Sequence, residues 1–377
     1  MNITVAIDSL KGSLSSMEAG YAICDGIKRV HPTAKVTVKP LADGGEGTVD
    51  ALIEGLGAEK IDLVVTGPLG KPVNTYYGYL NDTNTAILEM ASAAGITLLK
   101  SKELNPFVTT TYGVGEMILN AIDRGARRFI IGIGGSATND GGVGMLRALG
   151  YKFIDNSGRE VRDGAIDLGL IHNIIKPKIN LFKDIDFKIA CDVNNPLCGS
   201  NGATYIFGPQ KGLKDSELKD VDSSMNSYSQ VAAKVLGKDC SNDAGCGAAG
   251  GLGFAFKAFL DAALTPGIEL LLNLINLEQY IIGSDIVITG EGRLDHQTAM
   301  GKAPIGVAKL AKKHNAGVIA FAGSVTHDAN ACNDEGIDAF FPILRSICTL
   351  DEAMDNNNAK RNMTDTVEQV FRLVKIG

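Results

Sequence analysis

The chain has 377 residues and a formal net charge of −7, with 45% hydrophobic and 21% charged residues. These values are typical of a globular protein, and the length predicts two domains of roughly 100 to 200 residues each. Acidic and basic residues are interspersed without a Lys/Arg block, so neither a nucleic-acid partner nor a membrane-surface partner is expected. No run of about 18 uncharged apolar residues is present, so no membrane span is expected. The expected partners are therefore small molecules.

The cysteines and the amino terminus indicate the compartment. The seven cysteines are scattered without a CxxC pair, so neither a disulfide framework nor a zinc site is predicted. No charged and apolar leader precedes the first predicted strand. We therefore expect reduced thiols and a cytoplasmic location.

The first predicted strand, residues 3–7, ends in the polar loop 8–15, and a helix follows. Ser15 and Glu18 form a capping box, and apolar residues recur on one helix face as far as Val30. Because ligands bind at the carboxyl ends of strands in α/β folds, this loop is predicted to bind a ligand. The loop side chains that suit a phosphate or a hydroxy-acid are Asp8, Ser9, Lys11 and Ser13.

The next strands, residues 34–39 and 61–66, continue the alternation of strand and helix until residues 67–70 break it. A predicted antiparallel hairpin over residues 73–90 then departs from the pattern. We place a domain boundary after residue 68 for this reason.

In the second domain, residues 110–124 predict a helix and residues 128–133 a strand that leads into the glycine-rich loop 134–142. A further strand covers residues 185–190. Residues 284–289 restore the first strand pattern, so the chain returns there to its first domain. The predicted fold is α/β, with residues 1–68 and 284–377 in one discontinuous domain and residues 69–283 in an inserted second α/β domain.

The carboxyl-terminal part of the first domain ends in a predicted helix. The segment Asp355 to Arg361 is rich in asparagine and charge, and we expect it to be an exposed loop before that helix.

Two glycine patterns invite a dinucleotide interpretation, since no P-loop motif is present. Residues 132–137 follow a strand and are trailed by a second strand ending near Asp155, which leaves a nicotinamide-dependent dehydrogenase as an alternative function. Against it, Asp140 in the same loop would repel a pyrophosphate. Residues 245–250 fit the pattern without a preceding strand, so close helix packing over small residues is predicted there.

Acidic residues beside glycines recur at strand ends, while the five histidines lie apart and no GxSxG elbow exists. Phosphoryl transfer needs such carboxylates for magnesium and for the attacking hydroxyl, and backbone N–H groups and Lys or Arg for the phosphates. A non-catalytic sensor of phosphorylated acids is a third alternative. The loops concerned carry Asp8, Asp43 with Glu46, Asn139 with Asp140, Asp192 with Asn194, and Glu291 with Asp295.

The same loops resemble the motifs of the bacterial glycerate kinase type-1 family. They occur in the family's order, from the first strand to the terminal helix. Two departures are visible: Leu10 stands where the family has Phe, which affects packing, and Asn194 stands where it has Asp. The second departure argues against a charged metal ligand at that position. The matching segments are residues 8–15, 43–48, 134–142, 191–196, 290–298 and 301–304.

The resemblance implies ATP-dependent phosphorylation of D-glycerate with Mg²⁺, giving a phosphoglycerate. It favours 2-phosphoglycerate and leaves 3-phosphoglycerate open. It also implies a Rossmann-like three-layer domain with a second α/β domain inserted into it, and an active-site cleft between the two. The oligomeric state is left open, a homo-oligomer included.

Roles are assigned to these residues by chemistry, as hypotheses. Asp192 would receive the hydroxyl proton, and Lys11 would bind the transferring phosphoryl group or the substrate carboxylate. The predicted substrate-binding residues are Asp8, Ser9, Ser13, Arg293 and Asp295. The predicted nucleotide-binding residues are Gly134, Gly135, Ser136, Asn139 and Asp140. The predicted metal ligands, direct or through water, are Asp43 and Glu46.

Overall fold

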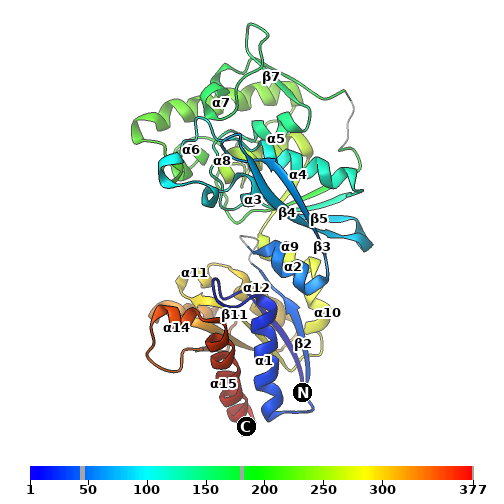
Figure 1. Cartoon of the computed structure of the whole chain (residues 1–377), viewed down its shortest axis with the longest axis vertical. Helices are drawn as coiled ribbons and strands as arrows, with labels where there is room; N and C mark the ends of the chain where they lie inside the picture. The colour runs from blue at the N-terminus through cyan, green and yellow to red at the C-terminus, as the bar shows by residue number, and fades with distance from the viewer. Residues whose placement is uncertain (43–46, 179–181, 376–377) are drawn as a thin grey trace. The chain divides into compact units, whose positions relative to one another are not determined.

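The computed structural model describes residues 1–42, 47–178 and 182–375, and the chain divides into two compact units (Figure 1). Unit 1 comprises Met1–Asp43, Asp50–Gly57 and Ile268–Gly377, and unit 2 comprises Gly44–Val49 and Ala58–Gly267. Among the described residues, no helix has the length and apolar character needed to cross a membrane. Each unit is built on its own sheet, so each is described by itself.

Unit 1 contains, within the described part of the chain, a five-stranded sheet in the order β13-β12-β11-β1-β2, with every neighbouring pair parallel. From β1 the chain moves outward to β2 on one side, whereas β11, β12 and β13 extend the sheet on the other. The strand order therefore switches direction between β1 and β11. The strands are β1 (Asn2–Ile7), β2 (Lys35–Pro40), β11 (Ile286–Leu294), β12 (Gly317–Val325) and β13 (Ala339–Pro342).

Helices cover both faces of this sheet. Helices α1 and α15 lie side by side (Figure 1), and their apolar faces bury Ile23, Met363 and Phe371 against Val5 and Ile7 of β1. Helix α12 packs on β11 and β12. Because parallel crossovers are right-handed and these strands extend the sheet in opposite directions, α12 covers the face opposite to α1. This is the predicted three-layer, Rossmann-like arrangement.

The helices of unit 1 include several short ones near the carboxyl ends of the strands. They are α1 (Ser16–Val30), α2 (Thr48–Leu56), α9 (Gly267–Leu274), α10 (Leu277–Ile281), α11 (His296–Ala299), α12 (Ala303–Lys313), α13 (Ala331–Asp334), α14 (Leu350–Met354) and α15 (Asn356–Val374), with a 3₁₀ turn at His327–Asn330.

The terminal helix begins earlier than predicted. Helix α15 starts at Asn356, so the exposed loop expected from Asp355 to Arg361 is wrong. The Asp355 side chain caps the helix by accepting a bond from the N–H of Asn358 at 2.9 Å, and Lys360 pairs with Glu18 of α1 at 2.8 Å. The pairing with α1 stabilises the first turns, and local composition does not reveal it.

Unit 2 contains, in the residues described, a six-stranded sheet in the order β10-β9-β6-β5-β4-β3. Strands β5, β6, β9 and β10 are parallel, whereas β3, β4 and β5 pair antiparallel, which confirms the predicted hairpin. The strands are β3 (Glu59–Thr66), β4 (Pro72–Leu80), β5 (Thr85–Glu89), β6 (Arg128–Gly132), β9 (Asp186–Ala190) and β10 (Ala263–Thr265), with β7 (Lys152–Ile154) and β8 (Asn173–Ile175) in a separate two-stranded sheet.

Strand β3 belongs to the second sheet, although the sequence interpretation placed residues 61–66 in the first domain. It pairs along its whole length with β4, a partner that follows it across a short turn. The division into units accordingly falls after Gly57 rather than after residue 68, and the return falls at Ile268 rather than at residue 284.

The helices of unit 2 contribute to a large apolar core that takes in one face of the central strands, where Leu88, Ile131 and Ile189 lie in register. They are α3 (Ala91–Ala94), α4 (Tyr112–Asp123), α5 (Val143–Ala148), α6 (Ala203–Phe207), α7 (Asp215–Leu236) and α8 (Ala248–Leu260), with 3₁₀ turns at Asn81–Thr83, Ile96–Leu98, Ser101–Glu103, Ala165–Leu170 and Pro209–Lys211.

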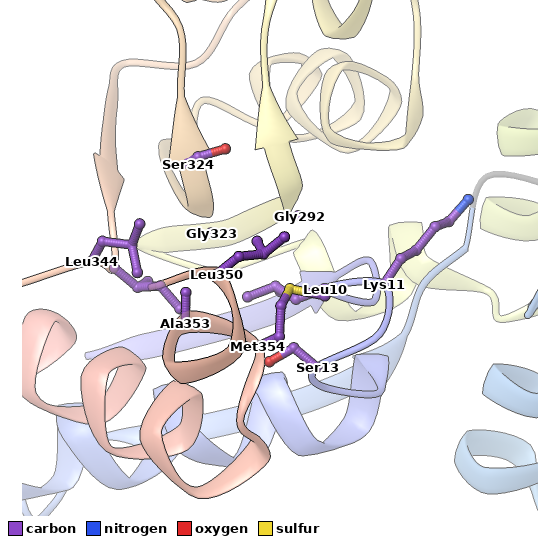
Figure 2. A pocket seen from close by; sticks show the side chains of 11 residues that line it. Leu10, Lys11, Ser13, Gly292, Gly323, Ser324, Leu344, Leu350, Ala353 and Met354 are labelled. Carbon is purple, nitrogen blue, oxygen red and sulfur yellow. The ribbon is translucent and has the colours of Figure 1, made fainter. Parts of the chain in front are cut away.

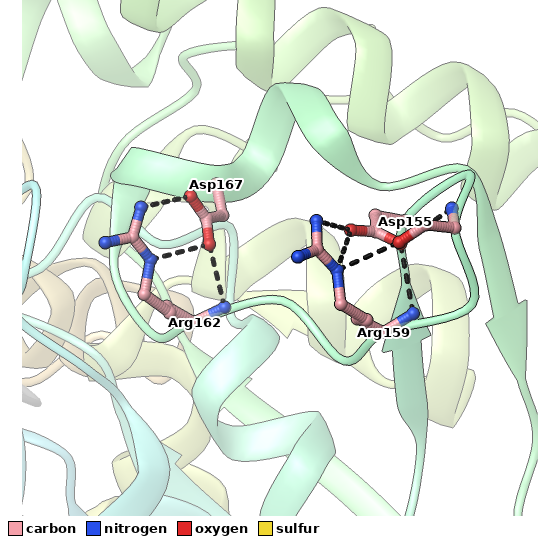
Figure 3. A network of polar contacts seen from close by, with 5 residues as sticks. Asp155, Arg159, Arg162 and Asp167 are labelled. Atoms are coloured by element: carbon pink, nitrogen blue, oxygen red, sulfur yellow. Dashed lines mark hydrogen bonds and ion pairs between the residues drawn. The ribbon is translucent and has the colours of Figure 1, made fainter.

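The dinucleotide interpretation of residues 132–137 is wrong, because β7 is not a parallel neighbour of β6. Strand β7 pairs antiparallel with β8, whereas the fingerprint requires a parallel β-α-β unit. Asp155, near which the second strand was predicted to end, accepts hydrogen bonds from Arg159 Nε and Nη2 at 3.2 and 3.1 Å (Figure 3). Arg162 makes a similar two-bond contact with Asp167 along the same segment (Figure 3). Asp155 therefore serves local ion pairing.

Candidate active site

The loop after β1 lies against the end of β11, at the point where the strand order switches. The N–H of Asp8 donates to the carbonyl of Gly290 at 2.9 Å. A Cβ atom added to Gly292 would lie 3.6 Å from both the Cα of Leu10 and the N of Lys11. We call residues 8–13 and 290–295 together the unit 1 edge. Ligands of doubly wound sheets bind at such a switch point.

The tip of the first loop is a tight turn. Leu10 and Leu14 exchange backbone hydrogen bonds of 2.9 and 3.0 Å, and both side chains are buried in the core. Gly12 adopts a φ of +78°, which glycine reaches without strain. The turn therefore presents Lys11 at the surface, and Leu10, the departure from the family pattern, serves packing as expected.

Two polar residues of this loop are largely withdrawn from solvent. The carboxylate of Asp8 is buried and accepts the N–H of Ser9 at 2.6 Å. The hydroxyl oxygen of Ser13 is buried and has no hydrogen-bond partner among the described residues. The Ser13 carbonyl accepts a bond from Asn356 Nδ2 at 2.9 Å. Because a buried hydroxyl without a partner is costly, the Ser13 oxygen suits a ligand atom.

The end of β11 adds a cation and a carboxylate to the unit 1 edge. Arg293 is exposed, and its Nε lies 3.6 Å from Oδ2 of Asp295. Asp295 caps the short helix α11, since its Oδ1 accepts the N–H of Gln297 at 2.9 Å. Glu291, an acid outside the predicted site set, accepts the Thr298 hydroxyl at 2.6 Å. The sequence did place Glu291 in an acidic loop, but gave it no role.

The predicted metal ligands cannot be placed in this geometry. Asp43 and Glu46 lie outside the described residues. Within residues 1–42, 47–178 and 182–375, no cluster of three His, Cys, Asp or Glu side chains that could hold a metal ion is found. Magnesium in kinases is held by one or two carboxylates together with nucleotide phosphates and water, so such a cluster is not required of the protein alone.

In unit 2, the parallel neighbours β6 and β9 carry two predicted motifs to the same edge. The N–H of Ile133 donates to the carbonyl of Ala190 at 3.4 Å, so the loops that follow these strands begin side by side. We call residues 133–142 and 191–196 the unit 2 edge. Gly134 and Gly135 are exposed there, whereas residues 136–142 are buried.

The carboxylate of Asp140 faces the interior of the loop. It accepts hydrogen bonds from the N–H and hydroxyl of Thr111 at 2.9 and 2.7 Å, and from the N–H groups of Gly142 and Gly144 at 3.1 and 3.2 Å. Burial raises the pKa of this carboxyl, while the bonds from Thr111 and the glycines oppose that rise. These four donors favour a role in holding the loop.

Lys211 is a polar residue of this site that the sequence interpretation missed. Its side chain is only 2% exposed, and its Nζ donates to the Ser136 hydroxyl at 2.6 Å and to the Thr138 carbonyl at 2.7 Å. Burial lowers the pKa of this lysine to about 7, although Asp140 acts to raise it. Lys211 sits in a 3₁₀ turn far along the chain, and no local pattern marks it.

Asn139 is a further polar side chain of this loop that is buried, as Ser136 and Asp140 are. Its Nδ2 donates to the hydroxyl of Thr204 at 3.0 Å, and it is fully buried. Its Oδ1 is buried without a hydrogen-bond partner in the part of the chain that the structure describes. The side chains of Ser136, Asn139 and Asp140 therefore all point away from solvent.

A glycine run from α8 closes over the same loop. The N–H of Gly141 donates to the carbonyl of Gly250 at 2.9 Å, and Gly250 has a φ of +65°. A Cβ atom at Gly250 would lie 2.1 Å from the carbonyl oxygen of Thr138. The close packing predicted for residues 245–250 is thus confirmed. It holds the backbone of the loop at Thr138 and Gly141.

Asp192 occupies the end of β9 with its side chain exposed. One carboxylate oxygen, Oδ1, accepts the N–H of Gly267 at 2.8 Å, which orients the group. Asn194, two residues further on, is exposed as well. Asp192 thus presents an oriented carboxylate on the unit 2 edge, beside the loop of Gly134 and Gly135.

The structure therefore assembles the predicted residues into two groups, one in each unit. The unit 1 edge brings together Asp8, Ser9, Lys11, Ser13, Arg293 and Asp295. The unit 2 edge brings together Gly134, Gly135 and Asp192 at the surface, with Ser136, Asn139 and Asp140 beneath them.

The chain is similar to known proteins over nearly its whole length, which includes both groups of site residues. A family model described as the glycerate kinase family matches residues 3–375. The chain is 46% identical to the glycerate 2-kinase of Escherichia coli (strain K12) over 376 residues, covering 97% of this chain and 98% of that protein. It is 44% identical to the glycerate kinase of Bacillus subtilis (strain 168) over 377 residues, covering 100% of this chain and 98% of that protein.

A solved structure is similar over the same length. It is a crystal structure of a protein assigned as glycerate kinase 2 from Salmonella typhimurium LT2, with a TM-score of 0.92 and 42% sequence identity. The match covers 100% of this chain and 99% of that chain. The similarity therefore extends over the whole of both units and over both groups of site residues.

Proposed function

Because the chain belongs to the glycerate kinase family, we propose that it transfers the γ-phosphoryl group of ATP to the 2-hydroxyl of D-glycerate. The observation that carries this proposal is the match over residues 3–375, which leaves neither edge outside the family. The identity of 46% to a glycerate 2-kinase supports 2-phosphoglycerate as the product. ATP is the phosphoryl donor expected of a kinase in this family.

The unit 1 edge suits an anionic substrate. Lys11 supplies an ammonium group at an exposed turn, and Arg293 supplies a guanidinium that can bind a carboxylate through two parallel N–H donors. Asp8, Ser9 and Ser13 add a carboxylate and two hydroxyls within the same loop. Asp295, fixed by its capping bonds, would accept glycerate hydroxyls. Lys11 would neutralise the transferring phosphoryl group or the glycerate carboxylate.

The unit 2 edge suits phosphate and proton transfer. The exposed backbone at Gly134 and Gly135 suits close approach of phosphate oxygens, because neither residue carries a side chain of its own. Asp192 carries an exposed carboxylate oriented by the Gly267 N–H, and it would accept the proton of the substrate hydroxyl as the phosphoryl group transfers. Ser136, Asn139 and Asp140 would act by holding the loop.

Magnesium belongs to the same proposal. Asp43 and Glu46 are the residues we assign to it, and Asn194 is excluded as a charged ligand by its chemistry. When bound with ATP, the ion would offset charge on the β- and γ-phosphates. The roles proposed above for the side chains do not depend on the position of the ion.

A coupled assay for ADP release tests the function. D-glycerate, L-glycerate, glycolate and lactate should be offered with ATP and magnesium, and ADP release is expected with D-glycerate. Proton-coupled phosphorus NMR of the product should show a doublet from the single C2 proton, whereas 3-phosphoglycerate would show a triplet from the two C3 protons. Ligand binding without ADP release would contradict the kinase and favour the sensor. Reduced nicotinamide appearing instead would contradict it in favour of a dehydrogenase.

A further inference from the structure

Unit 1 contains a pocket of about 140 Å³ whose apolar lining is given no role above, although Lys11 and Ser13 also line it. It opens at the carboxyl ends of the strands, between the turn after β1 and the segment that follows β13. Its walls come from four parts of the unit: Leu10, Lys11 and Ser13; Gly292; Gly323 and Ser324; and Ile343, Leu344, Leu350, Ala353 and Met354.

The lining is mostly apolar. Leu10 lies at one wall, and Leu350 and Met354 of α14 extend toward it, as Figure 2 shows. Leu344, Leu350 and Met354 are exposed large hydrophobic side chains, with Leu350 at 75% exposure. Exposed apolar side chains gathered around a hollow mark a binding site more often than scattered ones do.

The shape of the pocket suits a flat ring. Gly292 and Gly323 contribute no side chains, so the backbone at the ends of β11 and β12 forms a bare wall. Met354 supplies a thioether, which makes favourable contacts with aromatic rings. An apolar cavity of about 150 Å³ holds a benzene molecule, so a pocket of about 140 Å³ has room for one six-membered ring with the rest of a larger ligand at its mouth.

Two hydroxyl groups, on opposite sides of the pocket in Figure 2, interrupt its apolar lining. Ser324 faces the pocket from β12, and Ser13 faces it from the turn after β1. The Ser13 hydroxyl is the buried oxygen that has no hydrogen-bond partner in the described residues. A ring nitrogen at this position would satisfy it, whereas a purely hydrocarbon ligand would leave the cost of its burial in place.

We infer that this pocket binds the adenine ring of ATP, an inference that rests on the proposed kinase function. The six-membered ring enters between Met354 and the bare backbone of Gly292, with a ring nitrogen at the Ser13 hydroxyl, which then serves ATP in place of glycerate. The ribose and phosphates leave through the mouth on the side of Lys11. Figure 2 shows the Lys11 side chain extending away from the apolar walls, so its ammonium group lies outside the pocket.

The position in the fold supports this occupant. The pocket lies at the switch point between β1 and β11, where doubly wound sheets bind their nucleotides. Glycerate, a small polar acid, matches neither the leucine and methionine walls nor the depth of the pocket. An aromatic ring that carries an anionic tail matches both the walls and the neighbouring lysine.

Filling the pocket tests the inference. Ala353→Phe places a ring inside the pocket from α14, and Ser324→Leu fills it from the opposite wall. We expect both variants to weaken ATP binding, measured by calorimetry, by about tenfold or more, because a hydrophobic pocket excludes a ligand group for which it has lost the space. Both variants should bind inorganic tripolyphosphate, which has the phosphates without the base, with the affinity of the wild type.

Leu373→Phe is the matched control, since Leu373 is an exposed residue of α15 in the same unit and lines no part of the pocket. It should bind both ligands as the wild type does. If either filled variant folds and binds ATP with wild-type affinity, or loses tripolyphosphate in proportion to ATP, the inference is overturned. Because binding is measured without turnover, a wild type that binds ATP and fails to phosphorylate glycerate would contradict the proposed function and leave the pocket result standing.

Discussion

The two edges differ in what they expose to a ligand, since the unit 1 edge exposes charged side chains and the unit 2 edge exposes mainly backbone. On the unit 1 edge, two cationic side chains are exposed, Lys11 on a tight turn and Arg293 at a strand end, while Asp8 beside them is buried. On the unit 2 edge, the polar side chains of residues 136–140 point inward and two glycines offer the backbone. The first edge therefore depends on which side chains it carries, and the second depends on the shape of a loop. Asp192 is the exception on the second edge, since its carboxylate is exposed.

Replacing Asp192 should have the largest effect on turnover. Asp192→Asn keeps Oδ1 as an acceptor for the Gly267 N–H, so the loop should hold its shape while the group loses its ability to take a proton. We expect kcat to fall by about 10² to 10⁴-fold, the range of a general base, with the dissociation constant for ATP changed by less than about twofold. Steady-state kinetics and calorimetry measure the two quantities.

Asp186→Asn is the control for this substitution, because Asp186 is an exposed acid at the opposite end of the same strand, β9. It should leave kcat unchanged. Near-normal turnover in Asp192→Asn would remove this carboxylate from the mechanism. The unit 2 edge would then act through its backbone alone, which would make the contrast with unit 1 complete.

The unit 1 edge should respond to loss of a single side chain. Lys11→Met keeps the length of the side chain and removes its ammonium, and we expect kcat/KM to fall by about 10 to 100-fold, the loss of one hydrogen bond to a charged group. Lys35→Met, at the start of β2 and thus at the opposite edge of the same sheet, should behave as wild type. Unchanged kinetics in Lys11→Met would mean that this edge does not act through its lysine.

Local sequence patterns predicted the unit 1 edge well. The apolar runs of β1 and β11 end at Asp8 and before Glu291, and parallel strands bring such ends to one edge. The residues from Gly290 to Leu294, which were predicted to follow the strand, continue β11 instead. The capping box of Ser15 and Glu18, which starts α1, is formed as predicted. Strand β3 was assigned to the wrong sheet because its antiparallel partner, β4, depends on pairing that an apolar run does not encode.

The sequence predicted where the loops of the unit 2 edge lie in the fold, but not which way their side chains point. A sequence shows that Asp140 follows a strand, but its burial depends on Thr111, which lies 29 residues earlier in the chain. Lys211 lies 75 residues after Ser136, to which it donates, and it sits in a turn without a recognisable motif. Contacts between distant segments decide which way a loop side chain points, so residue type alone could not separate a ligand-binding acid from a loop-holding one.

The smallest expected effect concerns the loop itself and appears as a change in stability with pH. Lys211 holds Ser136 and Thr138 from inside, and burial lowers its pKa from 10.5 to about 7. Between these two values the unfolded chain binds more protons than the folded one, so the free energy of unfolding rises with pH, and the gain is lost as pH falls toward 7. Lys211→Met removes this titration.

We therefore expect the difference in unfolding free energy between the wild type and Lys211→Met to grow by about 1.5 kcal/mol from pH 7 to pH 8.5, measured by denaturant titration. Lys257→Met is the control from the same unit: the bond from Lys257 to Asp243 raises the pKa of that lysine, so its removal takes away no titration in this window. A difference that stays constant between pH 7 and 8.5 would mean that Lys211 keeps an ordinary pKa in the folded chain. The loop would then rest on a charged ammonium, and the unit 2 edge would depend on side-chain charge as the unit 1 edge does.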